Sequence, residues 1–170
     1  MAITRLGGAN AISGTIPAAN VATLTFSNFP TDSVIQTKHY LISNSDTNTT
    51  STSFVDIGSA FNFTPLSTNS ILIIHITTDT KFVGGSIGQK IRLLKDGTAV
   101  TPLGSNGSWL QYRNDSGTSN NHSSTAFFTK IANSSTSQIA FKLQQATFDD
   151  NTVAVGNWGN TEVVIQEIKG

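Results

Sequence analysis

Three histidines are candidate functional residues, because imidazole groups can bind metals and transfer protons. His39, His75 and His122 fall in three different segments, and no two of them stand at the spacing of a metal-ligand pair. His75 interrupts an apolar run, so we expect a satisfied core histidine, with a place at a subunit interface as the alternative. His122 lies in the polar sequence SNNHSS. There we expect solvation, with receptor contact as the alternative.

Carboxylates offer two further candidate sites, one for calcium and one for glycoside hydrolysis. Asp149 and Asp150, followed by Asn151, supply hard oxygens for calcium but lack the spaced ligands of a dedicated loop, so a plain turn is expected. Glu162 and Glu167 supply the two carboxylates that glycoside hydrolysis needs. They stand five residues apart on one expected strand and therefore face opposite sides of a sheet. Since no nucleophile, base and orienting group can be placed together, we expect no enzyme activity and no cofactor.

Aromatic residues suggest a contact surface in the stretch GSNGSWLQYRNDSGTSNNHSS. Trp109 and Tyr112 stand beside small polar residues, and rigid rings next to adaptable amides are typical of carbohydrate or protein contacts. Arg113, Asn114 and Asn120 could add hydrogen bonds. The stretch therefore predicts contact with a host surface glycan or envelope protein, and the alternative is that both rings pack into the core.

Charge and composition exclude several classes of function. Ten basic and ten acidic residues cancel, and Lys and Arg form no cluster, which removes the electrostatic attraction behind most nucleic-acid binding. Apolar runs are about four residues long, whereas a membrane helix needs roughly twenty, so no membrane insertion is expected. Cysteine is absent, which excludes disulfides and thiolate metal sites within the chain.

The elements that must position these residues are short strands. Helix signals are scarce, and from Ser33 onward strand patterns alternate with turn clusters, which predicts an all-β antiparallel sandwich or barrel. The run ILIIHITTD is apolar on both faces at its start and is expected to be central. Asp96-Gly97 predicts a tight hairpin. Strands are expected in SVIQTKHYLIS, FVDIG, FNFTP, ILIIHITTD, QKIRLLKDGTAVTP, SWLQYR, TAFFTKIA, QIAFKLQQA and TEVVIQEIKG, with loops at 44–53 and 114–124.

The first part of the chain has a different character. Residues 2–28 are small, rich in Gly, Ala and Asn, and aperiodic, but they include side chains too apolar for a solvated tail. We expect an extended N-terminal arm over residues 1–32 that becomes ordered against another surface, followed by a head domain over residues 33–170. A disordered leader is the alternative.

The order of these motifs resembles that of a family of phage virion surface proteins and fibre-tip domains. The likeness runs through SVIQTKHYLIS, a Ser/Thr loop, TSFVDIGSAFNFTPLSTNSILIIHI, IRLLKDGTAV and a closing TEVVIQEI, and covers roughly Ser33 to Ile168. The resemblance implies a jelly roll like those of tumour necrosis factor and complement heads, assembled as a homotrimer.

The resemblance also implies roles for particular residues. Ile71, Ile73 and His75 would face the three-fold axis, because they alternate on a face that a lone sandwich would leave partly wet. The arm would attach the head to other virion proteins, with Ile3, Leu6, Ile12 and Ile16 as attachment residues. The expected location is the virion surface.

The expected function is a phage virion structural protein that forms a short surface fibre or fibre head and contacts the host. The alternative is a capsid decoration (cement) protein that stabilises the head shell. A free-standing lectin-like or cytokine-like protein is the third class.

Overall fold

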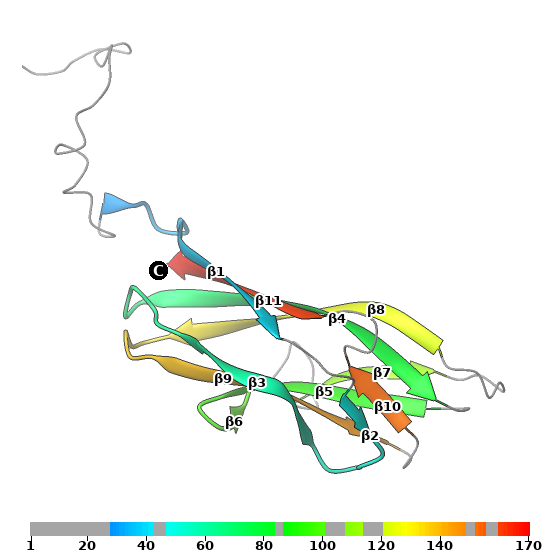
Figure 1. Ribbon diagram of the computed structural model, residues 1–170. Coiled ribbons are helices and arrows are strands. Elements are labelled where there is room, and N and C mark those ends of the chain that lie inside the picture. The colour runs from blue at the N-terminus through cyan, green and yellow to red at the C-terminus, as the bar shows by residue number, and fades with distance from the viewer. Residues whose placement is uncertain are drawn as a thin grey trace, which may run out of the picture.

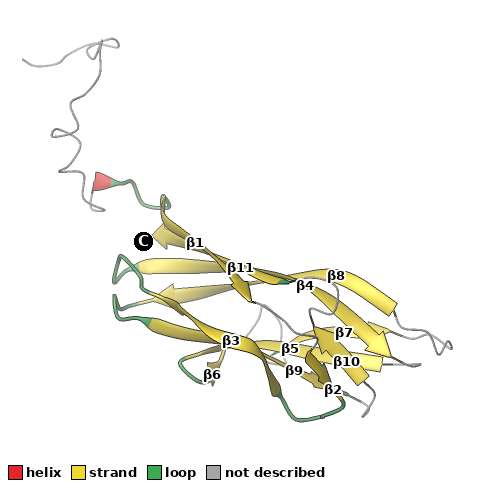
Figure 2. Cartoon of the chain, in the orientation of Figure 1, coloured by secondary structure: helices red, strands yellow, loops and turns green. Residues whose placement is uncertain are grey.

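The computed structural model describes residues 28–42, 47–83, 87–100, 108–113, 121–148, 152–155 and 160–170. Figure 2 shows strands joined by loops and turns, with one short helical turn at the start of the described chain. These strands are β1 (Val34–Ile42), β2 (Thr47–Thr49), β3 (Val55–Phe63), β4 (Ser70–Val83), β5 (Ile87–Lys95), β6 (Thr98–Ala99), β7 (Trp109–Arg113), β8 (Asn121–Asn133), β9 (Ile139–Thr147), β10 (Thr152–Val155) and β11 (Thr161–Lys169).

The strands form two sheets that face each other (Figure 1). In the first, called the β4 sheet, the order is β1-β11-β4-β10-β2, and β8 pairs with the other edge of β4. In the second, the β5 sheet, the order is β3-β9-β5-β6, and β7 also pairs with β5. All these pairings are antiparallel. The predicted all-β antiparallel sandwich is confirmed, and its strand order is compatible with a jelly roll, which stays a prediction.

A hydrophobic core fills the space between the two sheets. Each strand contributes alternate residues, because successive side chains point to opposite faces. Leu72, Ile74 and Ile76 of β4 are fully buried, and Leu93 and Phe141 cover them from the β5 sheet. Burying side chains of this size contributes about 1.5–3 kcal/mol each, so this contact holds the two layers together.

Two local predictions are confirmed. β4 is central, since it pairs with β11 and β10 on one side and with β8 on the other. Asp96 and Gly97 form the two-residue turn between β5 and β6, with Lys95 paired to Thr98. Their φ angles are 49° and 81°, and a type I′ turn requires positive φ at both positions.

Other predicted boundaries were wrong. FVDIG and FNFTP form one strand, β3, in which Gly58 at φ 58° opens a bulge that leaves residues 58–60 without partners on β9. The expected loop at 44–53 contains β2, and β10 was not predicted. The expected loop at 114–124 ends early, because β8 begins at Asn121 and extends the pairing with β4 to Phe82. Long-range pairing adds these segments to the sheet although β2 and the start of β8 are polar in sequence and β10 is only four residues long.

Candidate functional site

The outward side of the β4 sheet is unusually apolar, and we call it the β4 outer face. It is formed by Val34, Leu41, Ile71, Ile73, His75, Phe128, Val164 and Ile168. Three of these side chains are half exposed or more: Leu41 at 57%, Phe128 at 54% and Val34 at 50%. Large exposed apolar patches on a soluble domain mark interaction surfaces.

Strand register brings the apolar residues into rows. Ile71 of β4 lies between Ile168 of β11 and Ala132 of β8. His75 lies between Val164 and Phe128, and the His75 and Phe128 rings stack with centroids 6.4 Å apart. Between these two rows lies a mixed row, in which Ile73 stands between Gln166 of β11 and Lys130 of β8. The apolar side chains therefore form two patches that Ile73 links on β4.

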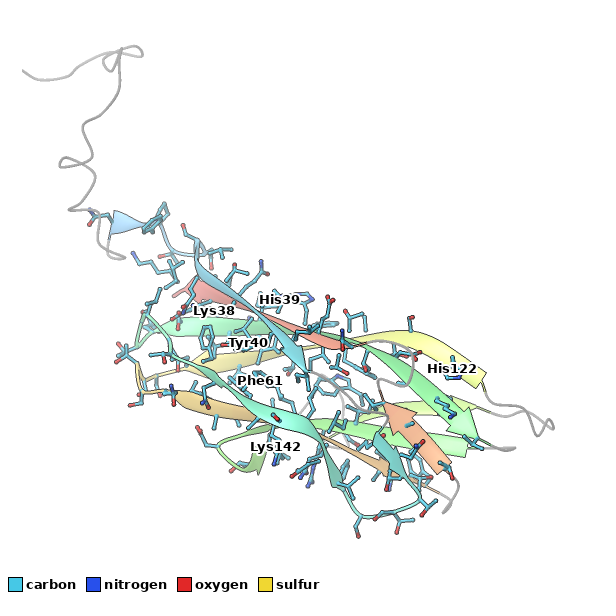
Figure 3. All side chains as sticks on the ribbon, in the orientation of Figure 1. Lys38, His39, Tyr40, Phe61, His122 and Lys142 are labelled. Carbon is cyan, nitrogen blue, oxygen red and sulfur yellow. The ribbon has the colours of Figure 1, made fainter. Side chains whose placement is uncertain are left out.

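The histidines do not form a common site. His75 is exposed, so the expectation of a buried core histidine was wrong: in the run ILIIHI both faces of β4 are apolar, and the sequence alone does not tell which faces inward. His39 Nε2 lies 3.7 Å from Glu162 Oε2 on the same outer face. His122 is on β8 rather than in a loop, with Nδ1 3.5 Å from Asp79 Oδ2. Figure 3 shows His122 well separated from His39.

The two glutamates of β11 lie on opposite faces, as their spacing predicts. Glu162 is exposed on the outer face, whereas Glu167 is fully buried on the inner side. They therefore cannot act on one glycosidic bond as a carboxylate pair.

Glu167 instead organises the turn that precedes β4. Its carboxylate accepts hydrogen bonds from the backbone N–H of Leu66 at 2.8 Å and of Ser67 at 3.0 Å. The Ser70 hydroxyl donates to it at 2.8 Å and the Gln36 amide at 3.1 Å. A buried carboxylate with this many donors is a structural anchor for the turn that follows the Phe-Thr-Pro step.

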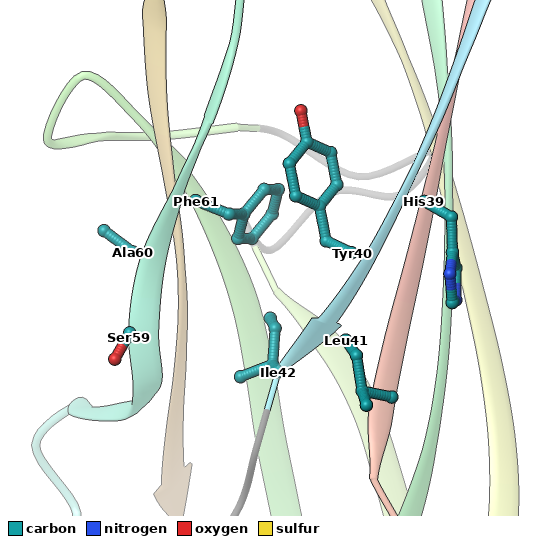
Figure 4. A pocket seen from close by; sticks show the side chains of 7 residues that line it. All are labelled: His39, Tyr40, Leu41, Ile42, Ser59, Ala60 and Phe61. Atoms are coloured by element: carbon teal, nitrogen blue, oxygen red, sulfur yellow. The ribbon is translucent and has the colours of Figure 1, made fainter.

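An open groove of about 390 Å³ lies between β1 and β3, where the edges of the two sheets meet. It is lined by His39, Tyr40, Leu41, Ile42, Ser59, Ala60 and Phe61 (Figure 4). The Tyr40 hydroxyl donates to the Asn62 carbonyl at 2.6 Å, and the Tyr40 and Phe61 rings are 4.9 Å apart. Burial raises the pKa of Tyr40. These contacts join the two sheets along this side of the sandwich.

The outward side of the β5 sheet is polar and charged. Asp56 on β3 accepts hydrogen bonds from Lys142 Nζ at 2.5 Å and from Gln144 Nε2 at 2.7 Å. These bonds, that of Lys142 first, hold the pKa of Asp56 below its ordinary value. The two outward surfaces of the sandwich therefore differ: the β4 outer face carries rows of apolar side chains, whereas this one is mainly polar and charged.

The predicted receptor-contact residues fall into two groups. Trp109 packs against the core, with its ring 5.2 Å from that of Phe127, which supports the alternative that this residue is structural. Tyr112 and Arg113 lie on β7, but their side chains are outside the described part of the structure. The same holds for the whole of Asn114, Asn120, Asp149, Asp150, Asn151 and the attachment residues Ile3, Leu6, Ile12 and Ile16.

Of the described residues, no group of three or more His, Asp or Glu side chains could hold a metal ion. Within the same ranges, no helix combines the length and apolar character needed to cross a membrane. No protein-family model matches the chain, and no curated protein does.

Proposed function

We propose that this chain is a structural protein of a phage particle, a homotrimeric β head that forms a short surface fibre or fibre head and contacts the host. The observation that carries the proposal is the β4 outer face, on which two apolar rows are linked by Ile73. We infer the trimeric state and the virion role from the resemblance in motif order. The described residues contain no catalytic constellation that would favour an enzyme instead.

The β4 outer face suits a self-association interface. Its centre is formed by His75, Phe128 and Val164, and aromatic side chains are enriched at the centres of protein interfaces. Around this centre lie Ile71 and Ile73, the residues expected at the three-fold axis. Covering this patch removes apolar area from water at a gain of about 25 cal/mol per Å².

The charge distribution on the same face favours identical copies as the occupant. Glu162 and His39 already pair with each other within the chain. Lys130, which pairs with Ile73, lies on β8 between the two apolar rows. A face with few unpaired charges meets a second copy of itself without strong like-charge repulsion, whereas a highly charged face would not.

The assembly is tested by substitution at the centre of the face. Ile73→Asp places a charge in the proposed interface and should convert trimer to monomer, because a buried unpaired charge is strongly unfavourable. Thr98→Asp is the matched control, since Thr98 is exposed on β6 of the other sheet. A trimer that survives Ile73→Asp would place the interface elsewhere.

The virion role is tested by labelling. Antibodies raised against residues 33–170 should label discrete projections on purified phage particles and should reduce adsorption to the host. Label spread over the whole capsid shell, with adsorption unchanged, would instead establish the decoration role. A chain absent from the particles would refute both.

A further inference from the structure

We propose that the outward side of the β5 sheet carries a binding site for the anionic groups of an acidic polysaccharide, centred on Lys90 and Arg92. Alternation along β5 places these two side chains on one face, because Ile91 and Leu93 between and beyond them are buried in the core. Residues two apart on a strand are separated by roughly 6.6 Å, so the two cations are neighbours.

Arg92 is held in place before any ligand arrives. Its guanidinium lies over the ring of Phe54, with Cζ 3.8 Å from the ring centroid. Nε and Nη2 both donate to Gln144 Oε1, at 2.8 and 2.7 Å. A guanidinium has five N–H donors, so the Nη1 and Nη2 edge keeps donors for a carboxylate or phosphate, which Arg can bind through two parallel hydrogen bonds.

Lys90 is positioned by a second aromatic ring. Its Nζ lies 4.4 Å from the ring centroid of Phe148, which is 43% exposed. That ring rests against β5 at Gly88, where a Cβ atom would come within 2.2 Å of Phe148 Cδ2. The glycine therefore leaves the space that allows the ring to lie beside Lys90.

The positive charge of this cluster is not neutralised by the described residues. The nearest described carboxylate in the network, Asp56, is already engaged with Lys142 Nζ and Gln144 Nε2. In the described part of the chain, neither Lys90 nor Arg92 has a carboxylate partner. Two fixed, unpaired cations on one face form a preorganised receptor for anions, because little side-chain entropy is lost on binding.

A sugar polymer fits this cluster better than a nucleic acid does. Tight nucleic-acid binding needs many phosphate contacts, whereas the described residues of this face supply two unpaired cations and the net charge of the chain is zero. The exposed ring of Phe148 adds an apolar surface on which the C–H face of a sugar can pack. The ligand is thus a polysaccharide whose anionic group is the carboxylate of a uronic acid or a phosphate.

This inference rests on the proposed function only in assigning the β5 sheet to the outside of the assembled head. The test measures binding of the full chain at low salt to polygalacturonate, to phosphomannan and to neutral dextran. Binding to either acidic polymer and not to dextran is expected, and the preferred polymer identifies the anion. Arg92→Gln and Lys90→Gln should each weaken binding about tenfold, since each removes a charge-assisted contact.

Lys38→Gln is the matched control, because it removes the same charge from exposed β1 in the other sheet. Its binding should equal that of the parent chain. The proposal would be overturned if the chain bound neither acidic polymer, or if Lys38→Gln weakened binding as much as Arg92→Gln and Lys90→Gln do. It would also be overturned if the chain bound single-stranded DNA as tightly as the acidic polymers. Light scattering on the same samples keeps this test separate from that of the trimer, since a monomer that still binds the acidic polymer would refute only the assembly.

Discussion

Replacing Glu167 with glutamine should destabilise the protein far more than the same substitution at Glu162, five residues earlier on β11. The Glu167 carboxylate is fully buried and receives donors from two backbone N–H groups, one hydroxyl and one amide. The side-chain amide of the variant would keep one acceptor oxygen and would turn an NH₂ group toward some of these donors. Unsatisfied buried donors cost about 1–3 kcal/mol each.

The expected magnitude follows from the two donors that bond Oε2, Leu66 N–H and Gln36 Nε2, because an amide whose oxygen keeps the Oε1 position turns its NH₂ group toward both. Losing good partners for about two donors corresponds to roughly 2–6 kcal/mol. For a domain of this size, 1 kcal/mol shifts the melting temperature by roughly 2–4 °C. Glu167→Gln should therefore lower the melting temperature by roughly 4–24 °C.

The assay is thermal unfolding followed by circular dichroism, supported by urea denaturation at the same protein concentration. Glu162→Gln removes the same charge at an exposed site whose His39 partner is 3.7 Å away, and it should change the free energy of unfolding by less than about 1 kcal/mol. If Glu167→Gln unfolds at the same temperature as Glu162→Gln, the buried carboxylate does not anchor the turn before β4.

Three further substitutions test other contacts. Asp56→Asn should lower stability by less than about 1 kcal/mol at neutral pH, since the pair with Lys142 is exposed. Because the pKa of Asp56 is lowered, the stability that its ionised carboxylate contributes is present above the ordinary pKa of 3.8 and is lost as the pH falls through the lowered pKa. Urea denaturation should therefore show that the difference in stability between the variant and the parent chain vanishes in acid. Gly88→Ala should displace the Phe148 ring and cost roughly 1–3 kcal/mol in urea denaturation; a cost near zero would refute the close packing. Tyr40→Phe removes the hydrogen bond to the Asn62 carbonyl and should cost about 1 kcal/mol at pH 7, and an unchanged melting temperature would show that this bond does not join the sheets.

Local signals were the part of the fold that the sequence predicted well. The Asp96-Gly97 hairpin depends on two adjacent residues that accept positive φ, so a dipeptide was enough to predict it. The central place of β4 followed from its apolar character on both faces. The break expected near Gly58 was wrong because a glycine that opens a bulge looks, in sequence, like a strand end.

Sequence patterns could not predict the long-range contacts. β2 and β10 are short and carry little apolar periodicity, and their pairing is fixed by neighbours distant in the chain. Alternation about Ile91 could place Lys90 and Arg92 on one face. The rings that hold them, Phe148 and Phe54, come from other parts of the chain, so no spacing could reveal this cluster.

The outward-facing residues also show that local patterns do not reveal which side chains meet across strands. Ile71 and Ile73 were selected as interface residues because they alternate with the core positions, and they do lie on the outward side of β4. Phe128, which stacks on His75 from β8, was not selected. Its neighbour Phe127 is equally aromatic but faces the core, and only the register with β4 separates the two.

The molar mass of the purified chain in solution tests the central claim most directly. Light scattering coupled to size exclusion should give three copies of the 18.0 kDa chain, about 54 kDa, at micromolar concentration. The same measurement on Ile73→Asp should give a folded species of one copy. A parent chain that elutes as a stable 18.0 kDa monomer at that concentration would contradict the account.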